Sequence, residues 1–311
     1  MTKEFSKLQI QCPSFDCVLD RSTTLPNADR KVFRLDYYAH PVDAKIVKCL
    51  DLPGVRQVFG SAVSILTDLN MSQIISTGVP VGANTFPEID NIVRDCSSKL
   101  GINKPYVVIS NAISMNAITT GSDEEPFIIL GNILVRTMNK EQLRFIIGHE
   151  CGHIAMGHVI YHSVVNTLGS FTRAIPLIGP LAYRTTAFAL SAWCRRSEIT
   201  ADRAGLLCCG DLAAAERSLV QTETGLINAA GVDISDYVNE SKRYRRGNVL
   251  RRVNEYTAMH PPLTKRIEAL RLFYNSQIFC DAMGMDKQSH LLNEKQLAEK
   301  TEALIAVLGK E

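Results

Sequence analysis

The stretch Phe145–His158 constrains the fold of this chain more than any other part of its sequence. It reads FIIGHECGHIAMGH and contains the pattern His-Glu-x-x-His at His149, Glu150 and His153. Residues four apart lie on one face of an α-helix, so both imidazoles can bind one ion, with Glu150 placed to take a proton from a metal-bound water. The apolar neighbours indicate a buried helix, where charge needs a partner. The stretch predicts a zinc site; the alternative is a core helix with two incidental histidines.

A third metal ligand is expected downstream, because a catalytic zinc usually has three protein ligands and one open position. The segment RRSEITADRAG, residues 195–205, carries Glu198 and Asp202 four residues apart, again on one helical face. One carboxylate can bind the metal while the other orients a ligating histidine through its free ring N–H. The alternative is a salt-bridged surface helix, but the alanines and leucines of this segment indicate packing. We favour Glu198 as the ligand.

The composition is that of an ordinary globular protein. The 311 residues suffice for one large domain or two modest ones, and 46% of them are hydrophobic and 21% charged. A net charge of +2 is too small to indicate nucleic acid as a partner. Nine cysteines without a Cys-x-x-Cys pair, and an N-terminus without an apolar signal region, favour a reducing compartment. We expect a cytoplasmic protein.

The pattern of apolar residues predicts a mainly helical α+β fold with a small mixed sheet. Two β-branched runs, Tyr106–Ile109 and Phe127–Leu130, predict strands. Asn139 is expected to cap the metal-motif helix, which would run from Lys140 to about Tyr161. Other helices are expected at 43–49, 54–69, 88–100, 187–209, 212 to about 229, 263–279 and 293–308.

Two stretches raise the question of a membrane or nucleic-acid partner. In residues 163–193 the apolar runs are interrupted by two prolines and two arginines, and none approaches the roughly 20 residues of a spanning helix. We expect no span there. The stretch is interpreted as buried loop and helix, with a mobile lid or a surface for peripheral contact with a membrane or partner as the alternatives. The basic cluster within residues 235–256 is flanked by acidic residues, which favours a solvated helix face over a nucleic-acid site.

Three further residues near the motif are expected to play structural roles. On a helix that continues to Tyr161, His158 and His162 would lie about 180° and about 220° round from His149, so neither would face the ion. Cys151 would lie about 200° round and pack in the core.

Several segments, in this order along the chain, resemble the HtpX-like and CAAX-prenyl-endopeptidase-like gluzincin zinc metallopeptidases. They are Tyr38–Gly54 (YAHPVDAKIVKCLDLPG), Ser114–Gly121 (SMNAITTG), Pro126–Ile133, GHECGH, SEITADRAG and His260–Ile267 (HPPLTKRI). The resemblance covers roughly residues 38 to 275. Ile118 stands where the family usually has phenylalanine. Integral-membrane relatives have spanning helices that this sequence lacks, so it resembles a soluble, stand-alone relative.

The resemblance implies a role for each motif residue. His149, His153 and Glu198 would bind the zinc, Glu150 would act as general base, and Asp202 would orient a ligand. His260 and Arg266 would lie near the scissile carbonyl and stabilise its oxyanion. Asn116 and Ala117 would lie on an edge strand that pairs with an extended substrate backbone.

These inferences together predict a zinc-dependent endopeptidase for protein or peptide substrates, with metal-activated water as the nucleophile. Its parts would be an N-terminal extension (1–35), a gluzincin-type metallopeptidase domain (36–280) and a C-terminal helical tail (281–311). One rival is a zinc-stabilised binding or chaperone-like module that holds unfolded segments without cutting them, for which Glu150 would have no use. Another is a latent protease that is opened by a partner or by removal of a terminal segment. The sequence does not indicate an oligomeric state.

Overall fold

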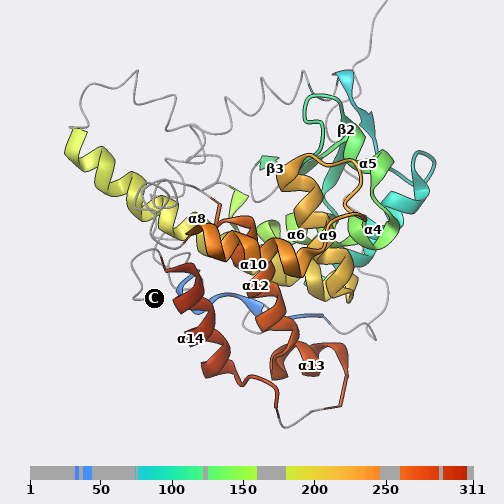
Figure 1. The fold of residues 1–311 in the computed structure, drawn as a ribbon. Coiled ribbons are helices and arrows are strands. Elements are labelled where there is room, and N and C mark those ends of the chain that lie inside the picture. Colours follow the sequence, from blue (N-terminus) through green and yellow to red (C-terminus); the bar gives the residue numbers. More distant parts are fainter. Residues whose placement is uncertain are drawn as a thin grey trace, which may run out of the picture. The chain divides into compact units, whose positions relative to one another are not determined.

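The computed structural model describes residues 32–34, 38–43, 74, 76–121, 125–159, 180–245, 260–286 and 290–306, without the side chains of 180–191 and 245. Figure 1 draws these residues as the coloured ribbon. All of them belong to one unit, Lys31–Glu311. The helices expected at 43–49 and 54–69 lie outside the described residues, apart from Asp43, as do most of the expected N-terminal extension and residues 160–179.

A four-stranded mixed sheet is present, as predicted. Its order is β1-β2-β4-β3, with β2 and β4 parallel and the two outer pairs antiparallel. The strands are β1 (Val79–Pro80), β2 (Tyr106–Ser110), β3 (Ala117–Gly121) and β4 (Pro126–Gly131). The two strands predicted from β-branched runs are the central pair, which is buried almost throughout. Among the described strands, β3 forms one edge of the sheet.

The mainly helical character of the fold is also confirmed. The described helices are α4 (Pro87–Leu100), α5 (Asn132–Thr137), α6 (Lys140–Ala155), α8 (Pro180–Cys209), α9 (Leu212–Thr224), α10 (Ile234–Arg245), α12 (Leu263–Tyr274), α13 (Gln277–Met283) and α14 (Glu294–Ile305). The short helix α5 was not predicted. The helix expected over 263–279 is two helices, because Ser276 caps the start of α13 with its side chain. Helix α9 ends at Gly225, which has a φ of 71°, rather than near residue 229.

The metal-motif helix α6 begins as predicted but ends earlier. Asn139 and Gln142 form a reciprocal capping box at its start. The helix ends at Ala155, not near Tyr161, since Gly157 adopts a left-handed φ of 67° that an α-helix cannot continue through. The N–H of His158 then donates to the carbonyl of His153 over 2.9 Å. The prediction of a longer helix was therefore wrong, and with it the expected direction of His158.

Helices α6 and α8 pack against one another at glycines. A Cβ atom added to Gly152 would lie 2.6 Å from Cβ of Ala204, and one added to Gly148 would lie 2.6 Å from Cβ of Cys208. On α8, a Cβ atom at Gly205 would lie 2.7 Å from the carbonyl oxygen of Phe145. Real side chains do not tolerate such distances, so only glycine at these positions permits the observed approach. This close contact brings the two halves of the metal motif together.

Helix α14, part of the predicted C-terminal tail, packs against α12 and also contacts α8 (Figure 1). The Arg196 guanidinium on α8 pairs with the carboxylate of Glu302, and Arg203 donates to Thr301 over 3.1 Å. Arg203 also donates to the carbonyl of Tyr38 over 3.2 Å. Glu302 also lies 3.5 Å from Nε2 of His40, so the tail helix contacts both α8 and the segment 38–43.

The two stretches considered as membrane or nucleic-acid surfaces are described only in part. No helix among the described residues has the length and apolar character needed to cross a membrane. The proposed peripheral surface, 163–193, lies almost entirely outside the described side chains. On α10, Lys242 pairs with Glu268 and Arg243 with Glu240, and both basic side chains are largely exposed. The expectation that no nucleic acid binds there stays a prediction.

Gly152→Ala tests the close packing of α6 on α8. Alanine is favoured over glycine inside a helix by roughly 0.5–1 kcal/mol, but the added methyl group would have to force the helices apart. Overpacking of this kind costs about 1–3 kcal/mol, so we expect a net loss of unfolding free energy in urea denaturation. Gly231→Ala is the matched control, since nothing lies within 4 Å of its added Cβ atom. Equal stability of the two variants would contradict the analysis.

Candidate active site

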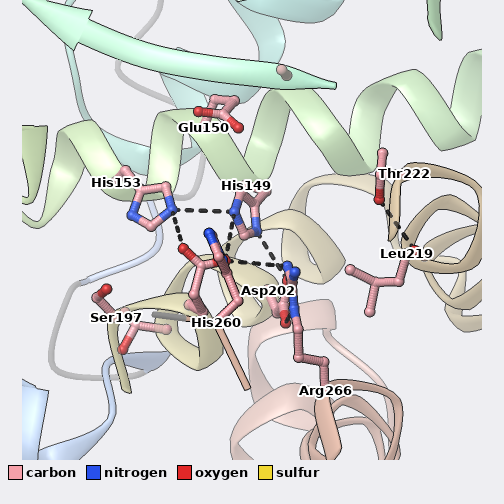
Figure 2. A network of polar contacts seen from close by, with 12 residues as sticks. His149, Glu150, His153, Ser197, Asp202, Leu219, Thr222, His260 and Arg266 are labelled. Carbon is pink, nitrogen blue, oxygen red and sulfur yellow. Dashed lines mark hydrogen bonds and ion pairs between the residues drawn. The ribbon is translucent and has the colours of Figure 1, made fainter. Parts of the chain in front are cut away.

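Two turns of α6 direct His149 and His153 to the same point in space. Their Nε2 atoms lie 3.2 Å apart, and both residues are buried (Figure 2). The Nδ1 atom of His149 lies 3.0 Å from Oδ1 of Asp202, and Nδ1 of His153 lies 3.0 Å from Nδ1 of His158. With Nδ1 of each ring in a hydrogen bond, both Nε2 lone pairs face one another. A cation between the two rings would remove the repulsion between these lone pairs, because both could bind it.

Glu198 on α8 completes a three-residue cluster. Its Oε1 atom lies 3.4 Å from Nε2 of His153, and its Oε2 atom lies 3.6 Å from Nε2 of His149. One ligand atom from each of the three residues lies within 4.8 Å of the others, and all three are buried. The structure therefore brings together the three residues predicted as zinc ligands.

Asp202 lies one helical turn beyond Glu198 and supports the first histidine, as its predicted role requires. Besides its contact with His149, its carboxylate accepts two hydrogen bonds from Arg266, over 2.9 Å and 2.7 Å. Although burial alone would raise the pKa of Asp202, the charge of Arg266 and these hydrogen bonds lower it. An ionised Asp202 holds the proton of His149 on Nδ1 and leaves Nε2 free for a metal.

Arg266 lines the cleft and is held by several carboxylates. The guanidinium also donates to Glu223 over 2.7 Å and lies 3.4 Å from Oε2 of Glu198, and it is only 5% exposed. A guanidinium held by three carboxylates is a fixed counter-ion. These contacts give Arg266 the geometry of a positioning residue for Asp202 and Glu198, and its predicted role at the oxyanion stays a prediction.

His260 is more accessible than the rest of the site. Its side chain is 58% exposed, and its Nδ1 atom lies 3.2 Å from Oε2 of Glu198. The negative charge of Glu198 and its hydrogen bond raise the pKa of His260. Figure 2 shows His260 beside the paired histidines, opposite the helix that carries them. This position is compatible with the predicted contact to a substrate carbonyl, which stays a prediction.

Glu150 lies on the side of α6 that faces the sheet (Figure 2). Its Oε2 atom accepts a hydrogen bond from the hydroxyl of Thr119 over 2.5 Å. Thr119 is in β3, so the edge strand orients the predicted general base. The sequence analysis did not single out Thr119. The signal was present, because alternate residues of a strand point to the same face and Thr119 follows Ala117 by two.

A cleft runs over the cluster, between β3 and helices α6, α8 and α9. Its lining includes His149, Glu150, His153, Glu198, His260 and Arg266 together with Asn116–Thr119 and three residues of α9, Leu219, Thr222 and Glu223. The α9 wall was not predicted, because nothing in its sequence marks these residues as lying near a metal motif more than sixty positions away.

Asn116 and Ala117 lie in the cleft wall, but their backbone groups are engaged. The carbonyl of Asn116 accepts from the N–H of Gly131 over 2.9 Å, and the N–H of Ala117 donates to the Asn116 side chain over 2.9 Å. The predicted pairing of an extended substrate with this edge strand stays a prediction. Ile118 is 38% exposed.

The charges of the site suit a divalent cation. Three buried carboxylates, those of Glu150, Glu198 and Asp202, share one buried guanidinium, that of Arg266. Burial raises the pKa of Glu198, but His260, His153 and Arg266 together lower it well below its ordinary value. Surplus negative charge in a buried site is costly unless a cation neutralises it. Imidazole and carboxylate donors in this number are those of zinc sites, so the residues fit that metal.

Two remaining predictions concern neighbours of the motif. Cys151 is fully buried in the core, as expected, and burial raises the pKa of its thiol. His158 contacts the second histidine of the motif, contrary to the expected direction, because α6 ends before it.

Comparison with known proteins agrees with this geometry. The model of peptidase family M48 matches residues 83–273, which is more than half of the chain. This chain belongs to peptidase family M48. The matched range lies within the predicted domain, whose boundaries at 36 and 280 stay a prediction.

Similar curated proteins carry names of the same kind. The plastoglobule-localized metallopeptidase 48 of Arabidopsis thaliana, a chloroplastic protein, is 26% identical over 216 residues, which are 67% of this chain and 62% of that protein. Protease HtpX of Xylella fastidiosa is 25% identical over 214 residues, 59% of this chain and 72% of that protein. The chain thus spans less than two thirds of the length of its Arabidopsis relative. No solved structure matches it significantly.

Thr119→Val tests the support of Glu150 by the edge strand. Valine keeps the shape but removes the hydroxyl, and a hydrogen bond to a charged group contributes about 1.5–3 kcal/mol. We expect kcat for peptide cleavage to fall roughly tenfold or more with little change in KM. Thr120→Val, whose side chain points to the opposite face of β3, is the control. An unchanged kcat for Thr119→Val would show that Glu150 needs no such support.

A pair of variants separates the roles of His260 and Arg266. His260→Ala removes an exposed side chain, so we expect thermal stability to change little while kcat falls about 10²–10³-fold if His260 stabilises the oxyanion. Arg266→Met leaves buried carboxylates without their counter-ion, which costs about 3–5 kcal/mol of unfolding free energy. Calorimetry and cleavage kinetics on both variants measure this contrast. A stable Arg266→Met protein with low kcat would restore Arg266 to the catalytic role.

Proposed function

We propose that this chain is a zinc-dependent endopeptidase that cleaves protein or peptide substrates bound in extended form. Membership of peptidase family M48 supports a metallopeptidase. The finer proposal rests on one observation: the Glu150 carboxylate lines the same open cleft as the cluster of His149, His153 and Glu198 and is held there by Thr119. A site that only needed a structural metal would gain nothing from a positioned carboxylate beside it.

The residues of the chain would divide the work as follows. His149, His153 and Glu198 would hold the zinc, which when bound supplies an activated water and polarises the scissile carbonyl. Glu150 would take the proton of the attacking water and pass it to the leaving amine. His260, the exposed donor at the cleft, would hydrogen-bond the developing oxyanion. Asp202 and Arg266 would keep His149 and Glu198 in place.

The edge strand β3 offers a way to bind the substrate. An extended chain that adds to a sheet edge gains main-chain hydrogen bonds whatever its sequence, and side-chain pockets then give selectivity. Ile118 and Thr119 on one wall, with Leu219, Thr222 and Glu223 of α9 on the other, line the space such a chain would occupy. We infer from this that the enzyme cuts within unfolded or flexible segments.

Two remaining points concern regulation and location. Among the described residues of the C-terminal tail, none lines the cleft, and α14 packs on α12 and contacts α8 instead. This arrangement favours a structural role for α14 over that of a removable plug. The cytoplasmic location stays a prediction.

Glu150→Gln tests the proposed function. Glutamine keeps the size of the side chain but cannot accept the proton, so we expect cleavage of a diverse peptide mixture to fall about 10²–10⁴-fold. Mass spectrometry of the new peptide termini measures it, with bound zinc quantified in both proteins as the control for an intact site. Equal cleavage by the two proteins would exclude Glu150 as the base. Zinc-loaded wild-type protein that cuts nothing would favour the binding-module or the latent-protease alternative.

A further inference from the structure

The second metal-motif histidine is connected to a residue far upstream in the sequence. Nδ1 of His153 lies 3.0 Å from Nδ1 of His158, and Nε2 of His158 lies 3.2 Å from Oδ2 of Asp43. The rings of His153 and His158 are 5.2 Å apart at an angle of 61°. His158 and Asp43 are completely buried. Asp43, His158 and His153 thus form a continuous buried row, which we call the relay.

Only one arrangement of protons lets His153 act as a ligand within this row. A metal-binding Nε2 must carry a lone pair, so the proton of His153 lies on Nδ1. Nδ1 of His158 then has to accept, which puts the proton of His158 on Nε2, facing Asp43. The carboxylate at the end of the row fixes this order. The first histidine of the motif reaches its carboxylate, Asp202, directly; the second reaches its own through another imidazole.

Asp43 is itself held by side chains of α8. Nε1 of Trp193 donates to Oδ1 over 2.9 Å, and the hydroxyl of Thr200 donates to Oδ2 over 2.6 Å. Thr200 also accepts from the N–H of His40 over 3.0 Å, which ties the segment 38–43 to the helix. Burial alone would raise the pKa of Asp43, but His158, Thr200 and Trp193 together lower it, so the carboxylate stays ionised and able to accept.

We propose that Asp43 and His158 are positioning residues of the metal centre, which hold His153 in the tautomer and orientation that bind the ion. Carboxylates and hydrogen-bond acceptors behind a metal-binding histidine typically raise metal affinity 10–100-fold. Asp43 lies forty residues upstream of the range matched by the family model, so this segment would extend the metal centre beyond that range. The proposal rests on the zinc ligands of the proposed function but not on cleavage of any substrate.

Zinc affinity, measured by competition with a chromogenic chelator, tests the relay without an activity assay. His158→Phe keeps a ring but removes the acceptor, and we expect the zinc Kd to rise 10–100-fold. His158→Asn retains an acceptor near the place of Nδ1 and should lie between the wild type and His158→Phe. The absorption spectrum of the cobalt-substituted protein gives a second readout, since a displaced His153 would change the visible bands of the bound ion.

Thr301→Val is the matched control, because it removes a buried hydrogen bond, that of Arg203, outside the relay. We expect it to lower thermal stability while the zinc Kd stays within about threefold of the wild type. If His158→Phe does not fold, Asp43→Asn, which removes the charge but keeps the shape, decides by the same measurement and should weaken zinc binding at least threefold.

The outcomes separate the relay from the proposed function. Wild-type zinc affinity in His158→Phe, or an equal loss in Thr301→Val, would overturn the relay and leave the proposed metal ligands intact. A wild-type protein that binds no zinc at all would overturn both. Unchanged cobalt spectra in the relay variants, with weakened affinity, would show that His158 acts only through stability and would also overturn it.

Discussion

The whole site depends on the close contact of helices α6 and α8. His149 and His153 belong to one helix and Glu198 to the other, and their atoms meet only because glycines let the two backbones approach. The glycines inside the motif, Gly148 and Gly152, therefore serve packing while their neighbours serve chemistry. This explains why the two kinds of residue alternate on α6: one face lies against α8 and the adjacent positions point into the cleft.

Around this contact the structure arranges charges in pairs. Each motif histidine contacts a further polar group through Nδ1, and Arg266 binds Asp202, Glu198 and Glu223 together. Buried charges are stable only when such pairing is nearly complete. This pairing is incomplete at one place, between the two Nε2 atoms and Glu198, where lone pairs and negative charge lie close together. A divalent cation fits there better than a proton, because it can bind all three ligand atoms at once.

Local sequence patterns predicted which helices and strands form, but they did not predict where every helix ends. The capping residue Asn139 and the β-branched strands of the sheet followed from the sequence, as did the three ligands, because helical spacing fixes which side chains share a face. The end of α6 did not, since Gly157 is one of several glycines and only its left-handed conformation shows that the helix stops before it. Thr119, the α9 wall and Asp43 were missed because contacts across the fold leave no periodic signal along the sequence.

The distribution of the site along the chain has a consequence for biosynthesis. Its parts come from residue 43, from α6, from α8 and from residue 266, so most of the polypeptide must be made and folded before the last contact forms. Contacts of such wide sequence separation form late, because the loops between them lose entropy when they close. A metal that binds only the assembled site would then stabilise the finished fold alone. Metal retention would in this way report the completion of folding, and a hydrolytic centre would not appear on partly synthesised chains.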